Sequence, residues 1–205
     1  MSKLVNDLIR DGYLKSDLII DAFSEINRIE FVPEELEREA EENVALPIGY
    51  GQTISQPLTV AFMLELLDPG RGQKILDVGS GSGWTTALLS YIAGSGGKVI
   101  GLERIEELKK IGEKNTDKYG YVKKGIAEFY SADGSTGFPS GAPFDRILVS
   151  ASTDRVPEEL KRQLAIGGKM VIPIRNSIVY LEKKNETDFY KEEYPGFVFV
   201  PLITG

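Results

Sequence analysis

The stretch Lys74-Ile75-Leu76-Asp77-Val78-Gly79-Ser80-Gly81-Ser82-Gly83 decides the fold expected for this chain. An apolar run with β-branched residues passes directly into glycines at alternate positions, and an apolar helical pattern follows over residues 84–93. The sequence therefore predicts a buried strand, a tight turn and a helix start, which together open a βαβ unit. Glycine in such a turn adopts positive φ without strain and lets a ligand approach the main chain closely.

The spacing of these glycines distinguishes this turn from two known nucleotide-binding motifs. A dinucleotide fingerprint reads G-x-G-x-x-G, whereas these glycines stand at alternate positions, and the Lys-Ser or Lys-Thr pair of a P-loop is missing. A second apolar strand, over residues 98–102, is followed by Glu103. An acid in that place can accept hydrogen bonds from both hydroxyls of a ribose. The pattern resembles the S-adenosylmethionine site of Rossmann-like methyltransferases; the alternative is a glycine-rich turn of another doubly wound protein.

Composition limits the chemistry that this chain can perform. Its 205 residues are 41% hydrophobic, enough for one sizeable core, and its formal net charge of −7 argues against an extended nucleic-acid surface. The chain contains no cysteine and no histidine, which removes disulfides, the commonest general base and the commonest metal ligand. We expect no metal site. Since no apolar run reaches membrane-spanning length, we expect a cytoplasmic protein without membrane partners. We also expect a monomer and, from the net charge, no nucleic-acid partner.

Alternating strand and helix patterns predict an α/β fold, namely a Rossmann-like, doubly wound, mostly parallel sheet with helices on both faces. An N-terminal helical cap and a C-terminal antiparallel strand pair, residues 178–182 with 197–202, complete it. Ser2 and Ser16 stand where helix N-caps are expected, and residues 34–42 read as a third, acidic helix. The predicted parts of this single methyltransferase domain, 1–205, are the cap (1–42), an active-site loop (43–57), the cofactor-binding βα core (74–173) and the C-terminal strands (174–205).

The predicted loop carries the most specific motif of the chain. Leu46-Pro47-Ile48-Gly49, continued by Gly51-Gln52-Thr53-Ile54-Ser55-Gln56-Pro57, resembles the signature loop of protein-L-isoaspartate O-methyltransferases. The resemblance runs from about Phe31 to the end of the chain. Further matches follow in chain order at Asp77–Gly83, Glu103–Ile105, Asp133-Gly134 with Gly137, Ala142–Asp145, Val156-Pro157, Gln163-Leu164, Gly167-Gly168 and Phe199–Leu202.

This resemblance implies transfer of a methyl group from S-adenosylmethionine to the free carboxylate of L-isoaspartyl residues in damaged proteins and peptides. The ester then collapses to a succinimide, which reopens partly to normal aspartate. Ser55 stands at the position of the family's active-site serine. The cofactor-binding residues that the resemblance implies are Thr53, Ile54, Asp77, Gly79, Ser80, Gly81, Gly83, Glu103, Arg104, Asp133 and Gly134.

The absence of histidine is compatible with this chemistry. A carboxylate has a reference pKa near 4, so it is ionised at neutral pH and needs no base. What the protein must supply is alignment of the reacting atoms, which can contribute about 7–11 kcal/mol.

Several alternatives remain open at this stage. Ser55 can instead serve as a cap for the helix that opens at Pro57, a role that stabilises by about 1 kcal/mol. Residues 150–153 read Ser-Ala-Ser-Thr where the family usually has small apolar residues, which leaves the peptide preference open. Two other functions are a methyltransferase acting on RNA or a small molecule, and a catalytically silent S-adenosylmethionine-binding module. Residues 150–153 lack the Asn/Asp-Pro-Pro-aromatic motif of many amino-methylating enzymes.

Overall fold

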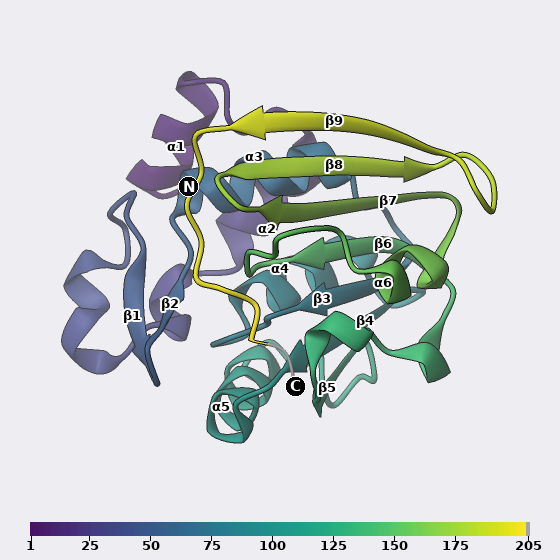
Figure 1. The fold of residues 1–205 in the computed structure, drawn as a ribbon. Coiled ribbons are helices and arrows are strands. Elements are labelled where there is room, and N and C mark those ends of the chain that lie inside the picture. Colours follow the sequence, from purple (N-terminus) through teal and green to yellow (C-terminus); the bar gives the residue numbers. More distant parts are fainter. Residues whose placement is uncertain (204–205) are drawn as a thin grey trace.

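The computed structural model describes residues 1–203 and has a seven-stranded sheet at its centre (Figure 1). Its strands are β3 (Lys74–Val78), β4 (Lys98–Glu103), β5 (Ala127–Ser131), β6 (Phe144–Val149), β7 (Leu164–Ile174), β8 (Ser177–Lys183) and β9 (Phe189–Pro195). They lie in the order β5-β4-β3-β6-β7-β8-β9. Neighbouring strands from β5 to β7 are parallel, whereas β8 and β9 are antiparallel to their neighbours. The predicted Rossmann-like sheet is confirmed.

Helices cover both faces of this sheet, as predicted. They are α1 (Lys3–Arg10), α2 (Asp17–Glu25), α3 (Pro57–Leu67), α4 (Trp84–Ala93), α5 (Glu106–Asp117) and α6 (Glu158–Gln163), with 3₁₀ turns η1 (Arg28–Phe31), η2 (Glu34–Glu39), η3 (Gly134–Thr136) and η4 (Pro139–Gly141). Successive strand residues point to opposite faces. On β3, Ile75 therefore joins the apolar cluster of α1 to α5, and Leu76 and Val78 join that of α6. None of the helices within residues 1–203 has the length and apolar character needed to cross a membrane.

The N-terminal segment packs onto the sheet through the same apolar cluster, which is our basis for proposing a single domain. Ser2 caps α1 as predicted, since its side chain accepts a hydrogen bond from Val5 N. Ser16 is the N-cap residue of α2, as predicted, but its side chain forms no capping bond. Its hydroxyl donates to Glu65 of α3 at 2.7 Å, and Glu65 also accepts from the main-chain nitrogens of residues 15 and 16. The acidic segment predicted as an α-helix over 34–42 forms the 3₁₀ turn η2 instead.

The predicted loop 43–57 contains a small antiparallel hairpin, β1 (Leu46–Gly49) and β2 (Gln52–Ile54). Gly49, Tyr50 and Gly51 form its tip with φ values of 89°, 55° and 71°. Two glycines allow this consecutive left-handed backbone at little cost. Leu46, Ile48 and Ile54 point from the hairpin into the apolar cluster, so the hairpin is held rigidly against the core.

The predicted pairing of residues 178–182 with 197–202 is wrong. The C-terminal antiparallel pair consists of β8 and β9, and β9 was missed because its sequence carries Lys191, Glu192 and Glu193 and leaves no residue fully buried. After Gly196 the chain turns back and crosses the carboxyl edge of the sheet (Figure 1). There, Val200 O accepts from Ser152 N at 2.8 Å, so the segment pairs with the loop after β6.

Candidate active site

A cleft that is open to solvent lies at the carboxyl ends of β3 and β6. The chain passes from β3 outward to β4 and β5, and later from β6 outward to β7 in the opposite direction, so the strand order reverses between β3 and β6. Open α/β sheets bind ligands at such a reversal point. Nine of the predicted site residues line the cleft, namely Thr53, Ile54, Ser55, Gly79, Ser80, Gly81, Glu103, Arg104 and Gly134.

The glycine turn forms the floor of this cleft. Gly79, Gly81 and Gly83 have φ values of 79°, 52° and 91°, and Leu102 O accepts from the main-chain nitrogens of Gly79 and Ser80 at 2.9 and 3.0 Å. A Cβ added at Gly81 would point toward Ile48 of the hairpin and lie 3.2 Å from its Cδ1. The alternate glycines therefore keep the main chain bare between β3 and the hairpin.

Gly83 faces away from the cleft and packs against α5. A Cβ added at Gly83 would lie 2.5 Å from Gly112 O and 2.7 Å from Thr116 Oγ1. Gly83 thus lets α4 and α5 approach one another, and we assign it this packing role rather than a ligand contact.

We expect Gly83→Ala to lower the free energy of unfolding by about 2–5 kcal/mol, adding left-handed backbone strain to the clash with Gly112. Urea denaturation measures the loss. Gly12→Ala is the matched control, because Gly12 has φ +77° and open space around its Cα. In that variant only the left-handed backbone strain should lower the free energy of unfolding, by about 1–2 kcal/mol. Equal losses in the two variants would rule out the close packing as the cause.

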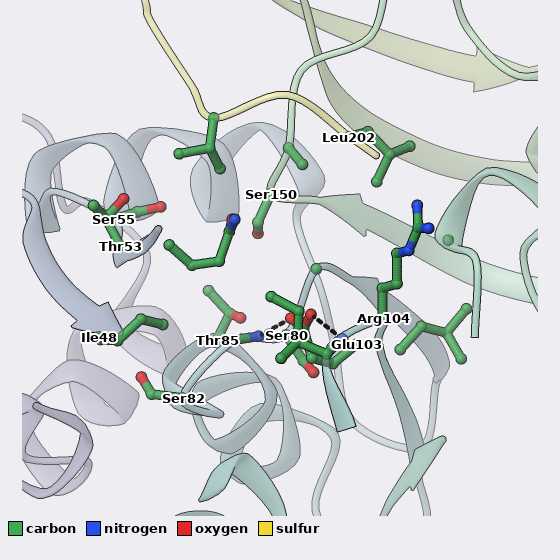
Figure 2. A pocket seen from close by; sticks show the side chains of 18 of the residues that line it. Ile48, Thr53, Ser55, Ser80, Ser82, Thr85, Glu103, Arg104, Ser150 and Leu202 are labelled. Carbon is green, nitrogen blue, oxygen red and sulfur yellow. Dashed lines mark hydrogen bonds between the residues drawn. The ribbon is translucent and has the colours of Figure 1, made fainter. Parts of the chain in front are cut away.

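Glu103 forms the opposite side of the cleft from the hairpin (Figure 2). Its two carboxylate oxygens accept from Gly81 N and Ile105 N, both at 3.0 Å. The side chain is 8% exposed, so these main-chain donors hold the carboxylate in one orientation at the surface of the cleft. The neighbouring Arg104 is exposed and also lines the cleft. An oriented carboxylate that keeps lone pairs for a ligand is the feature that recognition of vicinal hydroxyls requires.

The hairpin places Ser55 and Thr53 side by side at the edge of the cleft (Figure 2). The capping role considered for Ser55 is wrong, because the N-cap residue of α3 is Gln56 and its side chain forms no capping bond. Asn43 Oδ1 accepts from Leu58 N at 2.9 Å in its place. The hydroxyl of Ser55 is therefore not required by the helix.

Three predicted site residues do not line the cleft. Gly83 is one. Asp77 is fully buried below the turn, where one oxygen accepts from the hydroxyls of Thr85 and Thr86 at 2.7 and 2.6 Å. Burial raises the pKa of Asp77 to about 6, and the two hydroxyl donors reduce the shift. Asp133 caps η3 by accepting from Ser135 N at 2.8 Å. These side chains hold the first turn of α4 and the η3 turn in place.

Sequence reasoning did not select several residues that line the cleft, namely Ile48, Gln52, Ser82, Trp84, Thr85, Leu102, Ile105, Ala132, Ser150, Ala151 and residues 200–203. A signal existed for Ser150 and Ala151, because they follow directly after a parallel strand at its carboxyl end. Residues 200–202 belong to a stretch that matches the family, but their composition reads as a strand and does not place them at the cleft.

Comparison with known proteins assigns this arrangement to a family. The family profile described as "Protein-L-isoaspartate(D-aspartate) O-methyltransferase (PCMT)" matches residues 1–205. The chain belongs to this family. Protein-L-isoaspartate O-methyltransferases of Methanopyrus kandleri and Aeropyrum pernix are each 42% identical to it over 98% of the chain, which covers 90% and 78% of their lengths.

A solved structure of the same family has a closely similar fold. It is the crystal structure from Plasmodium falciparum described as a protein-L-isoaspartate O-methyltransferase in complex with S-adenosyl-L-homocysteine. The TM-score is 0.88 at 26% identity, with 98% of this chain and 97% of that chain covered. This chain and that structure therefore share one overall fold over nearly their full lengths.

Proposed function

We propose that the cleft transfers a methyl group from S-adenosylmethionine to the free carboxylate of an L-isoaspartyl residue in proteins and peptides. The single observation that carries the proposal is the position of the signature residues Thr53, Ile54 and Ser55. They lie across the same cleft from the glycine turn and Glu103 (Figure 2). One wall is thus built for a nucleoside, and the other carries the part of the chain specific to this family. Membership of the family supports the same activity.

The residues of the cleft fit S-adenosylmethionine. A bare main chain at Gly79 and Gly81 leaves room for the methionine portion, and the oriented Glu103 carboxylate suits the ribose hydroxyls. Ser80 Oγ is buried and has no hydrogen-bond partner within residues 1–203, so a polar donor or acceptor remains at the floor. We assign Ala132 and Gly134 to the adenine side. S-adenosylmethionine, when bound, would supply a methyl group carried on a sulfonium, with the neutral thioether S-adenosylhomocysteine as the leaving group.

The protein's own contribution to the reaction is orientation and exclusion of water. The isoaspartyl carboxylate is already ionised at neutral pH, so no side chain has to remove a proton. We assign Ser55 the role of a hydrogen-bond donor that orients this carboxylate, and Thr53 and Ile54 the role of covering cofactor and substrate. Because opposite charges cancel as the methyl group moves, a cleft closed to water favours the transition state.

The product distinguishes this function from its alternatives. We expect protein incubated with labelled S-adenosylmethionine to label an isoaspartyl peptide and not the matched aspartyl peptide. A carboxyl methyl ester releases methanol in mild alkali, whereas a methylated amine or RNA base keeps its label. Alkali-stable label, or equal labelling of both peptides, would contradict the proposal. Binding of S-adenosylhomocysteine without any transfer would identify a silent binding module.

We further propose that the protein works as a monomer in the cytoplasm, on isoaspartyl-containing proteins and peptides and without nucleic-acid or membrane partners. A net charge of −7 supports the absence of nucleic-acid and membrane partners, since nucleic acids and anionic lipid surfaces attract basic faces.

A further inference from the structure

We propose that Arg28 is a positioning residue that fixes Ser55 relative to the cofactor turn. Arg28 lies on η1, outside the cleft, and no motif in the sequence points to it. Its guanidinium contacts both the main chain of Ser55 and the indole of Trp84, which line the cleft from two different elements. The inference rests on the proposed function and adds to it a residue that sets the separation of the two walls.

The guanidinium of Arg28 gathers main-chain carbonyls from two segments. It donates to Ala40 O at 3.0 Å, Glu42 O at 3.3 Å, Val44 O at 2.8 Å and Ser55 O at 3.1 Å. All four acceptors are uncharged, although Arg28 is only 3% exposed. A buried guanidinium without a carboxylate partner carries a large desolvation cost. Carbonyl bonds of this number, made by one rigid fork, offset it and leave the connected segments little freedom to move.

The other face of the guanidinium rests on Trp84. The Arg28 Cζ lies 5.4 Å from the centre of the indole, a cation–π distance. Trp84 is the first residue of α4, directly after Gly83 at the end of the cofactor turn. Its ring also packs edge-on against Phe23 of α2 at 5.6 Å. One side chain therefore links the carbonyl of Ser55 to the helix that begins where the cofactor turn ends.

Arg28 is itself held firmly. Phe31, on the same 3₁₀ turn, is 1% exposed and stacks on Tyr119 at 6.1 Å. The hydroxyl of Tyr119 accepts from Asn27 N at 2.9 Å, directly before Arg28. Burial lowers the pKa of Arg28 to about 10, so the guanidinium remains charged at neutral pH. A fixed, charged fork is suited to hold Ser55 at one place, and displacement of a reacting group by 1 Å can cost about 10²-fold in rate.

The test is a double-mutant cycle between Arg28→Lys and Ser55→Ala, with saturation kinetics on an isoaspartyl peptide. Lysine keeps the charge but has no fork that spans these carbonyls. We expect Arg28→Lys to lower kcat/KM for the peptide by about 10²-fold. The calorimetric Kd for S-adenosylhomocysteine should change little. In the Ser55→Ala background the same substitution should have little further effect, because residues that act through one another are not additive.

Arg146→Lys is the matched control for stability. Arg146 is also partly buried and donates to main-chain carbonyls, of Asp68 at 3.0 Å and Asp145 at 2.9 Å, but it lies on β6 at the amino edge of the sheet, away from the cleft. A variant that only loses stability should show a lower Tm with wild-type kinetics. We expect this result for Arg146→Lys and not for Arg28→Lys. If Arg28→Lys does not fold, Trp84→Phe weakens the same link while keeping an aromatic ring, and it should show the same non-additivity with Ser55→Ala.

Three results would overturn the inference, namely wild-type peptide kinetics in Arg28→Lys, equal losses in the wild-type and Ser55→Ala backgrounds, and an equal loss in Arg146→Lys. For Trp84→Phe, additive losses with Ser55→Ala would do so. A wild-type protein that binds S-adenosylhomocysteine but does not methylate the isoaspartyl peptide would overturn the proposed function, and this inference with it. An active wild type with an unaffected Arg28→Lys variant would remove the inference alone.

Discussion

Replacing Ser55 with alanine is expected to slow methyl transfer to isoaspartyl peptides by about 10²–10³-fold, the loss typical of one oriented donor that acts in the transition state. The hydroxyl lines the cleft and caps no helix, so its removal should leave the Tm unchanged. The Kd for S-adenosylhomocysteine should also stay near that of the wild type. Steady-state kinetics at saturating S-adenosylmethionine, with calorimetry and a thermal scan beside them, measure all three quantities.

Two further substitutions make this expectation specific. Thr53→Ala should affect the Kd for S-adenosylhomocysteine more than Ser55→Ala does, because we assign Thr53 to covering the cofactor. Ser24→Ala removes a hydroxyl on α2 that bonds Ile20 O at 2.9 Å, and it should leave both kinetic constants at wild-type values. If Ser55→Ala raises only the KM for the peptide, the hydroxyl binds the substrate equally well in the ground state and the transition state, and its role is weaker than proposed. A lower Tm with unchanged kinetics would remove Ser55 from the site.

Replacing Glu103 with glutamine is expected to weaken binding of S-adenosylhomocysteine by about 10²-fold or more. A hydrogen bond to a charged group is worth about 1.5–3 kcal/mol, and the amide can accept through one oxygen only. The amide nitrogen would also face one of two main-chain donors, Gly81 N or Ile105 N, and lose the bond that holds it. The variant therefore loses a ribose contact and part of the order of the cofactor turn.

Titration calorimetry with S-adenosylhomocysteine measures this loss directly and does not depend on turnover. Glu107→Gln is the matched control, because Glu107 is exposed on the first turn of α5 and does not line the cleft. It removes the same charge four residues away and should leave the Kd near the wild-type value. A wild-type Kd in Glu103→Gln would show that the ribose is not bound at this carboxylate.

Local patterns in the sequence predicted the parallel core and the floor of the site. The apolar run of residues 74–78 and the glycines that follow it require a strand and a tight turn wherever they are placed. Glu103 ends the next strand along the chain, and parallel strands end at one edge of a sheet, so the acid and the turn were expected at the same edge. The structure makes β3 and β4 neighbours, and Glu103 then accepts from Gly81 N at 3.0 Å.

The errors of the sequence analysis also have physical causes. Ser16 stands at the N-cap position of α2, but its hydroxyl and main-chain nitrogen donate to Glu65, forty-nine residues away in the chain. β9 carries charged residues on an exposed sheet edge, so it has no apolar alternation to detect. Residues 197–202 have strand composition, but Phe197 N donates to Asn176 O, and residues 200 and 202 bond to Ser152 in the loop after β6.

By itself, the sequence determined the fold class, the family resemblance and the residues of the cofactor turn, because each of these depends on neighbours within a few positions. Only the tertiary structure decided which side chains share the cleft. In it, Asp77 lies beneath the turn and accepts from Thr85 and Thr86, and Gln56 rather than Ser55 is the N-cap residue of α3. Residues 200–203 line the cleft. The tertiary structure also placed Arg28 against the carbonyl of Ser55, a contact between main chain and side chain that leaves no periodicity in the sequence.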